Sequence, residues 1–275
     1  MAFAISPKQG GFTLVELVIV IILLAILGIA VSHYIGFGTL LYRDVAAREN
    51  ILNSARFAIE RLNREVRSSL PNSQQITNNG NCLRFVPVVA SSQYLELAVA
   101  PAAPSNRVTS FALDGYIFQA SHRLSHRLAV YALSSDDIYG ASSTTLKAFS
   151  DYSDSVNPAE FSFASPVRWP LASPSQRLYL VERPVRYCVL SNGNLQREVL
   201  SWASESPPEQ VLETSLMAEQ IQLLAITAPN YQPPFAVREA TLSRNGVVKI
   251  FLNFVANEGA ESLVFHHSIH IQNVP

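Results

Sequence analysis

The sequence predicts an α+β fold, with one long N-terminal helix packed on an antiparallel β-rich head. Residues 12–31 form an apolar run of membrane-spanning length, and an amphipathic helical pattern continues from it to residue 70. The rest of the 275-residue chain holds short β-branched and aromatic runs separated by turn residues. About two hundred residues suffice for a hydrophobic core. Because the helix precedes the strands and does not alternate with them, the pattern indicates an α+β architecture.

The apolar run contains only two distinctly polar side chains, Thr13 and Glu16. At about 1.5 Å per residue, a helix over residues 12–31 spans about 30 Å, the thickness of the hydrocarbon core of a bilayer. An ionised carboxylate in that setting costs on the order of 2.5–3.5 kcal/mol. Since nothing else in the run can neutralise Glu16, its partner must come from outside the run.

Two simpler interpretations of this run leave Glu16 unexplained. One is a secretory signal peptide, with Lys8 as the basic region and residues 30–32 as a small-residue cleavage site. The other is an ordinary N-terminal transmembrane anchor. Neither accounts for the two glycines at positions 10 and 11, immediately before the apolar run.

Residues 32–70 are predicted to form the amphipathic half of the same helix. Apolar side chains recur on one face at spacings of three, four and seven residues. They are Val45, Leu52, Ala55, Ile59, Leu62 and Val66. Pro71 ends the pattern, because proline cannot donate to the helical ladder and restricts the residue before it. Gly28, Gly36 and Gly38 serve either close helix packing or local unwinding, and both interpretations stay open.

The head is predicted from residue 71 onward as a set of short strands. The runs with strand character are residues 83–90, 94–100, 115–119, 128–133, 178–181, 185–190, 247–255 and 263–271. Asn-Gly pairs at 192–193 and 245–246 lie between such runs and predict two-residue hairpins. Residues 134–175 and 204–208 are rich in proline and serine and are predicted to form surface loops or an inserted lobe.

Histidine clusters suggest a metal site at first sight. His122 and His126 are four residues apart. In the C-terminal run, strand alternation places His266 and His270 on one face and His267 on the other. We expect solvated or hydrogen-bonded strand histidines and no metal. The sequence has no nucleophile elbow, phosphate loop or zinc-protease motif, so neither an enzyme nor a cofactor is predicted. A formal net charge of −1 does not indicate a nucleic-acid-binding protein.

The segment Lys-Gln-Gly-Gly-Phe-Thr-Leu-Val-Glu-Leu at positions 8–17 resembles the class III signal of type IV prepilins and pseudopilins. The resemblance implies that a membrane peptidase cuts after Gly11 and that Phe12 is then N-methylated. It also implies that Glu16 pairs with the N-terminal amine of a neighbouring subunit, which supplies the missing cationic partner. Glycine suits the cleavage site, because it leaves the extended backbone unobstructed.

This resemblance divides the chain into four parts. They are a leader peptide at 1–11, the transmembrane half of the helix at 12–31, its amphipathic half at 32–70, and a β-rich head at 71–275. The implied partners are the prepilin peptidase and N-methyltransferase, other minor and major pilins, the inner-membrane assembly platform and inner-membrane lipid. The implied location is a single pass in the inner membrane with a periplasmic head, and then the pilus tip on a Gram-negative bacterium.

Cys82 and Cys188 are the two cysteines of the chain. A head on the far side of the inner membrane lies in an oxidising compartment, so we expect a disulfide between them. The alternative is two buried thiols. A metal site is disfavoured, because a structural metal needs more ligands than one cysteine pair.

Several short segments resemble the MshO family of minor pilins from mannose-sensitive haemagglutinin (MSHA) pili. These segments are residues 53–67, 70–73, 81–87, 184–188 and 270–275. Residues 60–67, within the first of them, are also loosely shared with J-type pseudopilins of type II secretion. Neither family accounts for the two loop tracts.

The resemblance and the size of the chain predict a minor pilin that takes part in pilus assembly at the tip and so in surface attachment. A head this large is unsuited to a major subunit, whose head repeats densely along a fibre. One alternative is a J-type pseudopilin of a type II secretion system. An alternative of another class is a sugar-binding tip adhesin that uses Trp169 or Trp202.

Overall fold

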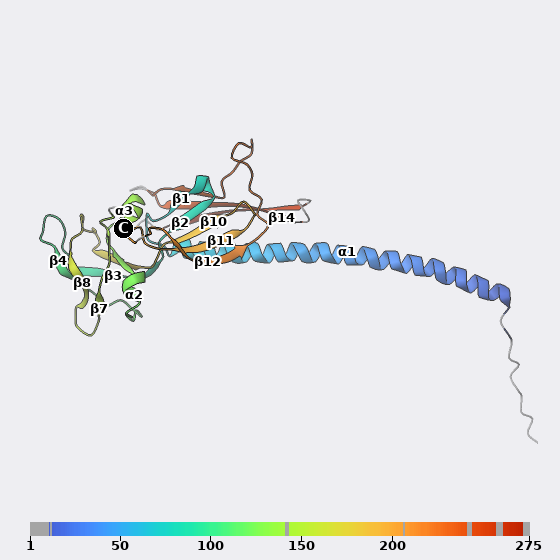
Figure 1. Cartoon of the computed structure of the whole chain (residues 1–275), viewed down its shortest axis with the longest axis horizontal. Helices are drawn as coiled ribbons and strands as arrows, with labels where there is room; N and C mark the ends of the chain where they lie inside the picture. The colour runs from blue at the N-terminus through green and yellow to red at the C-terminus, as the bar shows by residue number, and fades with distance from the viewer. Residues whose placement is uncertain are drawn as a thin grey trace, which may run out of the picture. The chain divides into compact units, whose positions relative to one another are not determined.

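The structure, a computed structural model, describes residues 11, 13–140, 143–205, 207–240, 244–256 and 261–271. One long helix, α1 (Leu14–Arg67), is followed by a strand-rich head, which confirms the predicted α+β class (Figure 1). The other helices are a single turn each: η1 (Asn78–Gly80), α2 (His122–Ser125) and α3 (Asp136–Tyr139). The chain divides into two compact units, residues 1–50 and 51–275.

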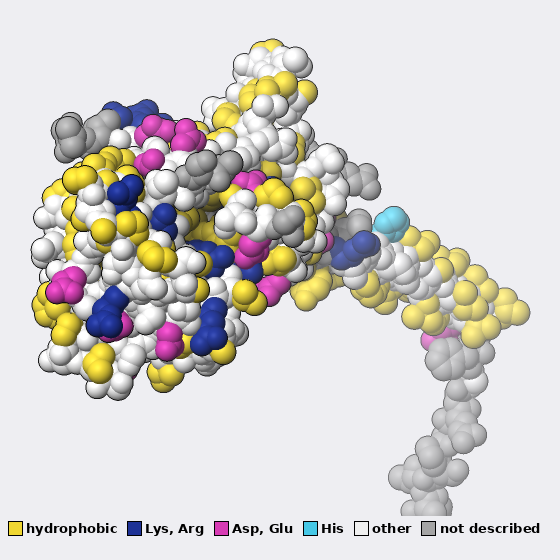
Figure 2. All heavy atoms as spheres, turned by 60° about the vertical axis from the view of Figure 1, so that its left-hand side comes forward, with side chains coloured by type: hydrophobic (Ala, Val, Ile, Leu, Met, Phe, Trp, Pro, Cys, Tyr) yellow, Lys and Arg dark blue, Asp and Glu magenta, His cyan; other side chains and the backbone are white. Residues whose placement is uncertain are grey.

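In the first unit, α1 is continuous through its three glycines. A side chain at Gly28, Gly36 or Gly38 would meet no atom within 4 Å, so neither packing nor unwinding is visible at these positions. The apolar side chains of residues 14–39 are exposed, and Figure 2 shows this part of the helix as a largely hydrophobic surface. Of the helices that the structure describes, α1 is the one long and apolar enough to cross a membrane.

The second unit begins with the last five turns of α1, which pack into the main hydrophobic core. The predicted stripe is buried at Ala55, Leu62 and Val66, each 0% exposed, whereas Val45 lies outside this unit and is exposed. Two antiparallel sheets complete the core. The first has the order β1 (Gln75–Thr77), β2 (Cys82–Phe85), β10 (Val185–Val189), β11 (Leu195–Leu200) and β12 (Val211–Ala218), and the second has β13 (Phe235–Arg238), β14 (Gly246–Ala256) and β15 (Glu261–Ile271).

A third, seven-stranded antiparallel sheet forms a lobe inserted between β2 and β10. Its order is β6 (Leu146–Lys147), β5 (Arg127–Ala129), β9 (Arg177–Val181), β3 (Val88–Glu96), β4 (Ser105–Ser110), β8 (Ala159–Val167) and β7 (Asp151–Ser153). The chain enters and leaves this lobe at adjacent points, because Val88 pairs with Val181 and the Glu182 N–H donates to the Pro87 carbonyl at 3.0 Å. The lobe has a separate aromatic-rich core.

Two predicted strands are wrong for identifiable reasons. Residues 83–90 do not form one strand, because Pro87 separates β2 from β3 and the two belong to different sheets. Residues 115–119 form no strand, and Tyr116 instead packs into the lobe core from an irregular segment. The tract 134–175, expected to form surface loops or an inserted lobe, belongs to the inserted lobe and contains α3, β6, β7 and β8.

The two Asn-Gly pairs behave differently. Residues 190–194 connect β10 to β11, and Gly193 adopts a φ of 83° in that turn, as a hairpin requires. The turn is one residue longer than predicted, because Leu190 and Asn194 are bonded to each other across it. The pair at 245–246 forms no two-residue hairpin, because β13 ends at Arg238 and pairs with the start of β14 across a longer connection.

Candidate processing and assembly site

The predicted cleavage site lies directly before α1. Gly11 is exposed, and a side chain at this position would meet no atom within 4 Å. Phe12, the predicted N-methylated residue, and residues 1–10 of the predicted leader lie outside the described residues. Cleavage and methylation therefore stay predictions.

Thr13 caps the N-terminus of α1. Its Oγ1 accepts a hydrogen bond from the Glu16 N–H at 3.3 Å, and its carbonyl accepts one from the Leu17 N–H at 3.1 Å. This is one half of a Thr-x-x-Glu capping box, in which the first side chain satisfies an otherwise unpaired amide of the first turn. The interpretation of the sequence missed this role of Thr13, although the spacing of three between Thr13 and Glu16 indicates it.

Glu16 lies in the first turn of α1, with its side chain exposed. A carboxylate at this position interacts favourably with the positive end of the helix dipole, by about 0.3–1 kcal/mol at an exposed site. Among the described residues, no cation forms an ion pair with its carboxylate. The helix dipole would offset only part of the cost of burial in lipid, and the pairing of Glu16 with the amine of a neighbouring subunit stays a prediction.

Residues 6–32 match the prokaryotic N-terminal methylation motif. The match supports a type IV pilin or pseudopilin, and with it membrane anchoring, processing by a prepilin peptidase and assembly with other pilins. No curated protein and no solved structure matches the chain.

A three-residue ion cluster holds α1 to the main sheet of the head. Glu65 of α1 accepts hydrogen bonds from Arg61 at 2.9 Å and from Arg197 of β11 at 3.0 Å. The bond to Glu65 raises the pKa of Arg61, and burial, followed by the charge of Glu65, raises the pKa of the nearby Tyr187 phenol. This cluster fixes which face of the helix meets β11.

Cys82 and Cys188 form the disulfide expected from the sequence. They lie directly opposite each other on the neighbouring strands β2 and β10. The two strands carry the chain into and out of the inserted lobe. The bridge therefore closes a loop with a sequence separation of 106 residues, which contains the whole lobe.

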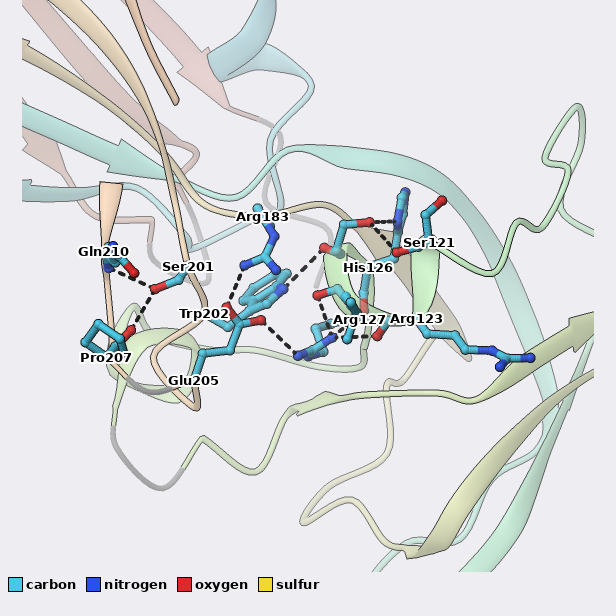
Figure 3. A network of polar contacts seen from close by, with 12 residues as sticks. Ser121, Arg123, His126, Arg127, Arg183, Ser201, Trp202, Glu205, Pro207 and Gln210 are labelled. Atoms are coloured by element: carbon cyan, nitrogen blue, oxygen red, sulfur yellow. Dashed lines mark hydrogen bonds and ion pairs between the residues drawn. The ribbon is translucent and has the colours of Figure 1, made fainter. Parts of the chain in front are cut away.

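A second polar network fastens the lobe to the segment between β11 and β12 (Figure 3). Glu205 in that segment binds Arg183 at 2.7 Å and Arg127 of β5 at 3.7 Å. The indole N–H of Trp202 donates to the Ser125 carbonyl at 3.2 Å, and the Arg127 guanidinium lies 5.3 Å from the centre of the Trp202 ring. The charged groups are largely buried, so these contacts hold the lobe in a defined position.

The tryptophans are not available to a sugar. Trp169 is 0% exposed and donates its indole N–H to the Thr145 carbonyl at 2.9 Å. Trp202 is 3% exposed. Stacking on a sugar ring needs an open aromatic face, so a sugar site at either tryptophan is contradicted.

The histidine pair of the lobe lies on and after α2 and not on a strand. The rings of His122 and His126 are 4.3 Å apart, and His126 is buried. Burial, and then the charge of His122, lower the pKa of His126 to about 4. On β15, His266 and His270 are exposed and His267 is half-buried on the opposite face, as the alternation predicted. In the described part of the chain, no three metal-ligating side chains come together.

Proposed function

We propose that this chain is a minor type IV pilin of the MSHA type, which helps to initiate or cap the pilus at its tip. The observation that carries the proposal is the methylation motif at 6–32, which runs directly into a membrane-length helix whose end packs in a β-rich head. In such a helix, the first half can lie in lipid or in the core of a filament, and the second half packs against the head of the same chain.

In this proposal the prepilin peptidase removes residues 1–11, and Phe12 becomes the methylated N-terminus. Residues 12–31 cross the inner membrane, residues 32–70 join them to the head, and residues 71–275 lie in the periplasm before assembly. Glu16 then attracts the amine of a neighbouring subunit. That attraction offsets the cost of keeping a carboxylate in lipid.

The inserted lobe supports a place at the tip. The seven-stranded sheet adds a second core to a head that already has one. A subunit that repeats along a fibre must fit its head between close neighbours on all sides, whereas a subunit at the end has one free side. A head enlarged by a lobe is therefore better suited to a minor component.

The competing proposal is a J-type pseudopilin of a type II secretion system. It is favoured by the same methylation motif and by the charged end of α1, where Glu60, Arg61, Arg64 and Glu65 belong to the segment that such pseudopilins share loosely. Both proposals need a membrane-held precursor with a large head. They differ in the assembly that the subunit joins, which is a pilus in the first proposal and a type II secretion system in the second.

Deletion of the gene separates the two proposals. We expect a strong loss of pili in electron micrographs, restored by the wild-type chain, with normal secretion of extracellular enzymes. Pili in normal number would contradict the assembly role. Normal pili together with lost secretion would instead support the pseudopilin.

A further inference from the structure

A cleft in the second unit contains two arginines that lack carboxylate partners. It lies where the end of α1, the start of β3, strand β9 and the end of β15 meet, and its volume is about 670 Å³. Arg67, Arg177 and His270 line it from three different elements. None of the described residues that line it is acidic.

Both guanidinium groups are accessible to an anion. Arg67 and Arg177 are exposed, and neither forms an ion pair with any residue that the structure describes. Elsewhere in the same unit, seven arginines among the described residues form ion pairs with carboxylates, as Arg61 and Arg197 do with Glu65. The cleft therefore combines two uncompensated positive charges with a concave shape, which raises the local concentration of anions.

The C-terminal end of α1 does not cancel this positive charge. Free carbonyls in a last helical turn carry partial negative charge and would repel an anion. Here the Arg64 carbonyl accepts the N–H and the hydroxyl of Ser68, at 3.2 and 3.0 Å. The hydroxyl of Ser69 donates to the Val66 carbonyl at 2.6 Å. These bonds occupy the Arg64 and Val66 carbonyls. The helix end carries only about half an elementary negative charge, so the two full positive charges of the arginines outweigh it.

We infer that this cleft binds a sugar that carries a carboxylate group. Guanidinium groups bind carboxylates through paired charge-assisted hydrogen bonds. The volume lies within the range of about 300–1,000 Å³ typical of sites for small molecules. Tyr179 and Asn245 contribute aromatic and amide groups to the wall, and Val88 and Ile271 contribute apolar surface. This mixture suits a compact, hydroxyl-rich anion better than an extended acidic peptide.

The site is distinct from the N-terminal assembly segment and from both tryptophans. Its residues are 67–69, 71, 88, 177, 179, 245 and 270–271, whereas the methylation motif ends at residue 32. Substitutions in the cleft are therefore expected to leave leader cleavage and pilus number unchanged. Sugar binding and pilus assembly can be tested separately.

The test uses the full chain in a neutral detergent, with two pairs of sugars as probes. Saturation-transfer NMR titrations compare galacturonate with galactose and glucuronate with glucose, because each pair differs in the carboxylate. We expect at least one of the acids to bind and its neutral counterpart to bind at least about tenfold more weakly, since a hydrogen bond to a charged group is lost. Added NaCl is expected to weaken binding of the acid.

Arg67→Gln and Arg177→Gln are each expected to weaken binding of the acid about tenfold. Arg56→Gln is the matched control, because Arg56 is also exposed and unpaired in the described residues but lies outside the cleft. The midpoint of thermal unfolding, followed by tryptophan fluorescence, verifies that each variant is folded. Arg177→Lys keeps the charge and is expected to retain part of the binding.

Three results would overturn the inference. The first is the absence of saturation transfer to both acids at millimolar concentration. The second is equal binding of each acid and its neutral counterpart, or an equal loss of binding in Arg56→Gln. The third is an acetylated tripeptide containing glutamate that binds more tightly than either acid, which would identify the occupant as a protein side chain.

Discussion

Replacing both cysteines by alanine tests the role that the structure gives to the disulfide at the base of the inserted lobe. Alanine is chosen because serine would leave a buried hydroxyl without a partner. Cys82 and Cys188 are each 4% exposed and separated by 106 residues in sequence. In the chain-entropy account, removing a cross-link of that span costs about 4.7 kcal/mol of folding free energy.

For a unit of this size, about 1 kcal/mol corresponds to a shift of about 2–4 °C in the unfolding midpoint. The expected shift is therefore about 10–20 °C downward. The assay is tryptophan fluorescence of the full chain in neutral detergent during heating. It reports on the head alone, because both tryptophans of the chain, Trp169 and Trp202, are buried there.

Reduction of the wild-type protein is the matched control and is expected to lower the midpoint by a similar amount. The alanine variant itself is expected to be insensitive to reductant. A shift below about 2 °C in both experiments would refute the reasoning, because the disulfide would then hardly reduce the conformational entropy of the unfolded chain.

Three further predictions concern single side chains. Glu65→Gln leaves Arg61 and Arg197 facing each other without a counter-charge, so chemical denaturation is expected to show a loss of about 1–3 kcal/mol, and an unchanged unfolding free energy would contradict the anchoring role. The pKa of His126 is about 4 in the folded state, below its unfolded value of about 6.5, so the unfolded state binds more protons between these values. The stability of the head is therefore expected to fall as pH drops from about 6.5 to 4. His126→Asn should flatten that dependence in thermal melts, and an equally steep fall in the variant would exclude His126 as its source. Glu16→Ala is expected to be cleaved normally but to co-purify poorly with other minor pilins, and wild-type recovery of the complex would contradict the assembly role of the charge.

The long helix was predictable because its signals are local. The apolar run, the stripe at Ala55, Leu62 and Val66, and the stop at Pro71 all follow from spacing along the chain, and α1 ends at Arg67 within a few residues of the prediction. The same holds for the alternation on β15, where the inward and outward side chains could be assigned by counting.

An inserted lobe was one of the two expectations for residues 134–175, but its strand pairing could not be predicted, because its strands pair across long separations. Val88 meets Val181, and β4 pairs with β8, which lies within the tract that was expected to form surface loops or an inserted lobe. One signal in that tract was nevertheless readable: Ala159, Phe161 and Phe163 alternate with more exposed residues and are buried in the lobe core. The proline and serine content around them obscured this period of two.

Of the candidate sites, only the N-terminal motif and the cysteine pair were predictable from the sequence. The motif at 6–32 and the cysteine pair could be found from residue types and spacing. The cleft between α1, β9 and β15 could not, since Arg67, Arg177 and His270 lie far apart in sequence and only the folded chain brings them to one surface.

The central claim is tested most directly by the mass of the N-terminal peptide of the protein isolated from the inner membrane of its host. The account predicts a peptide that begins at Phe12, lacks residues 1–11 and is heavier by one methyl group. Gly11 replaced by a bulky residue should leave the precursor uncut in the same membrane fraction. A wild-type chain that keeps residues 1–11, or that begins after position 32 as a secretory signal peptide would require, would contradict the account.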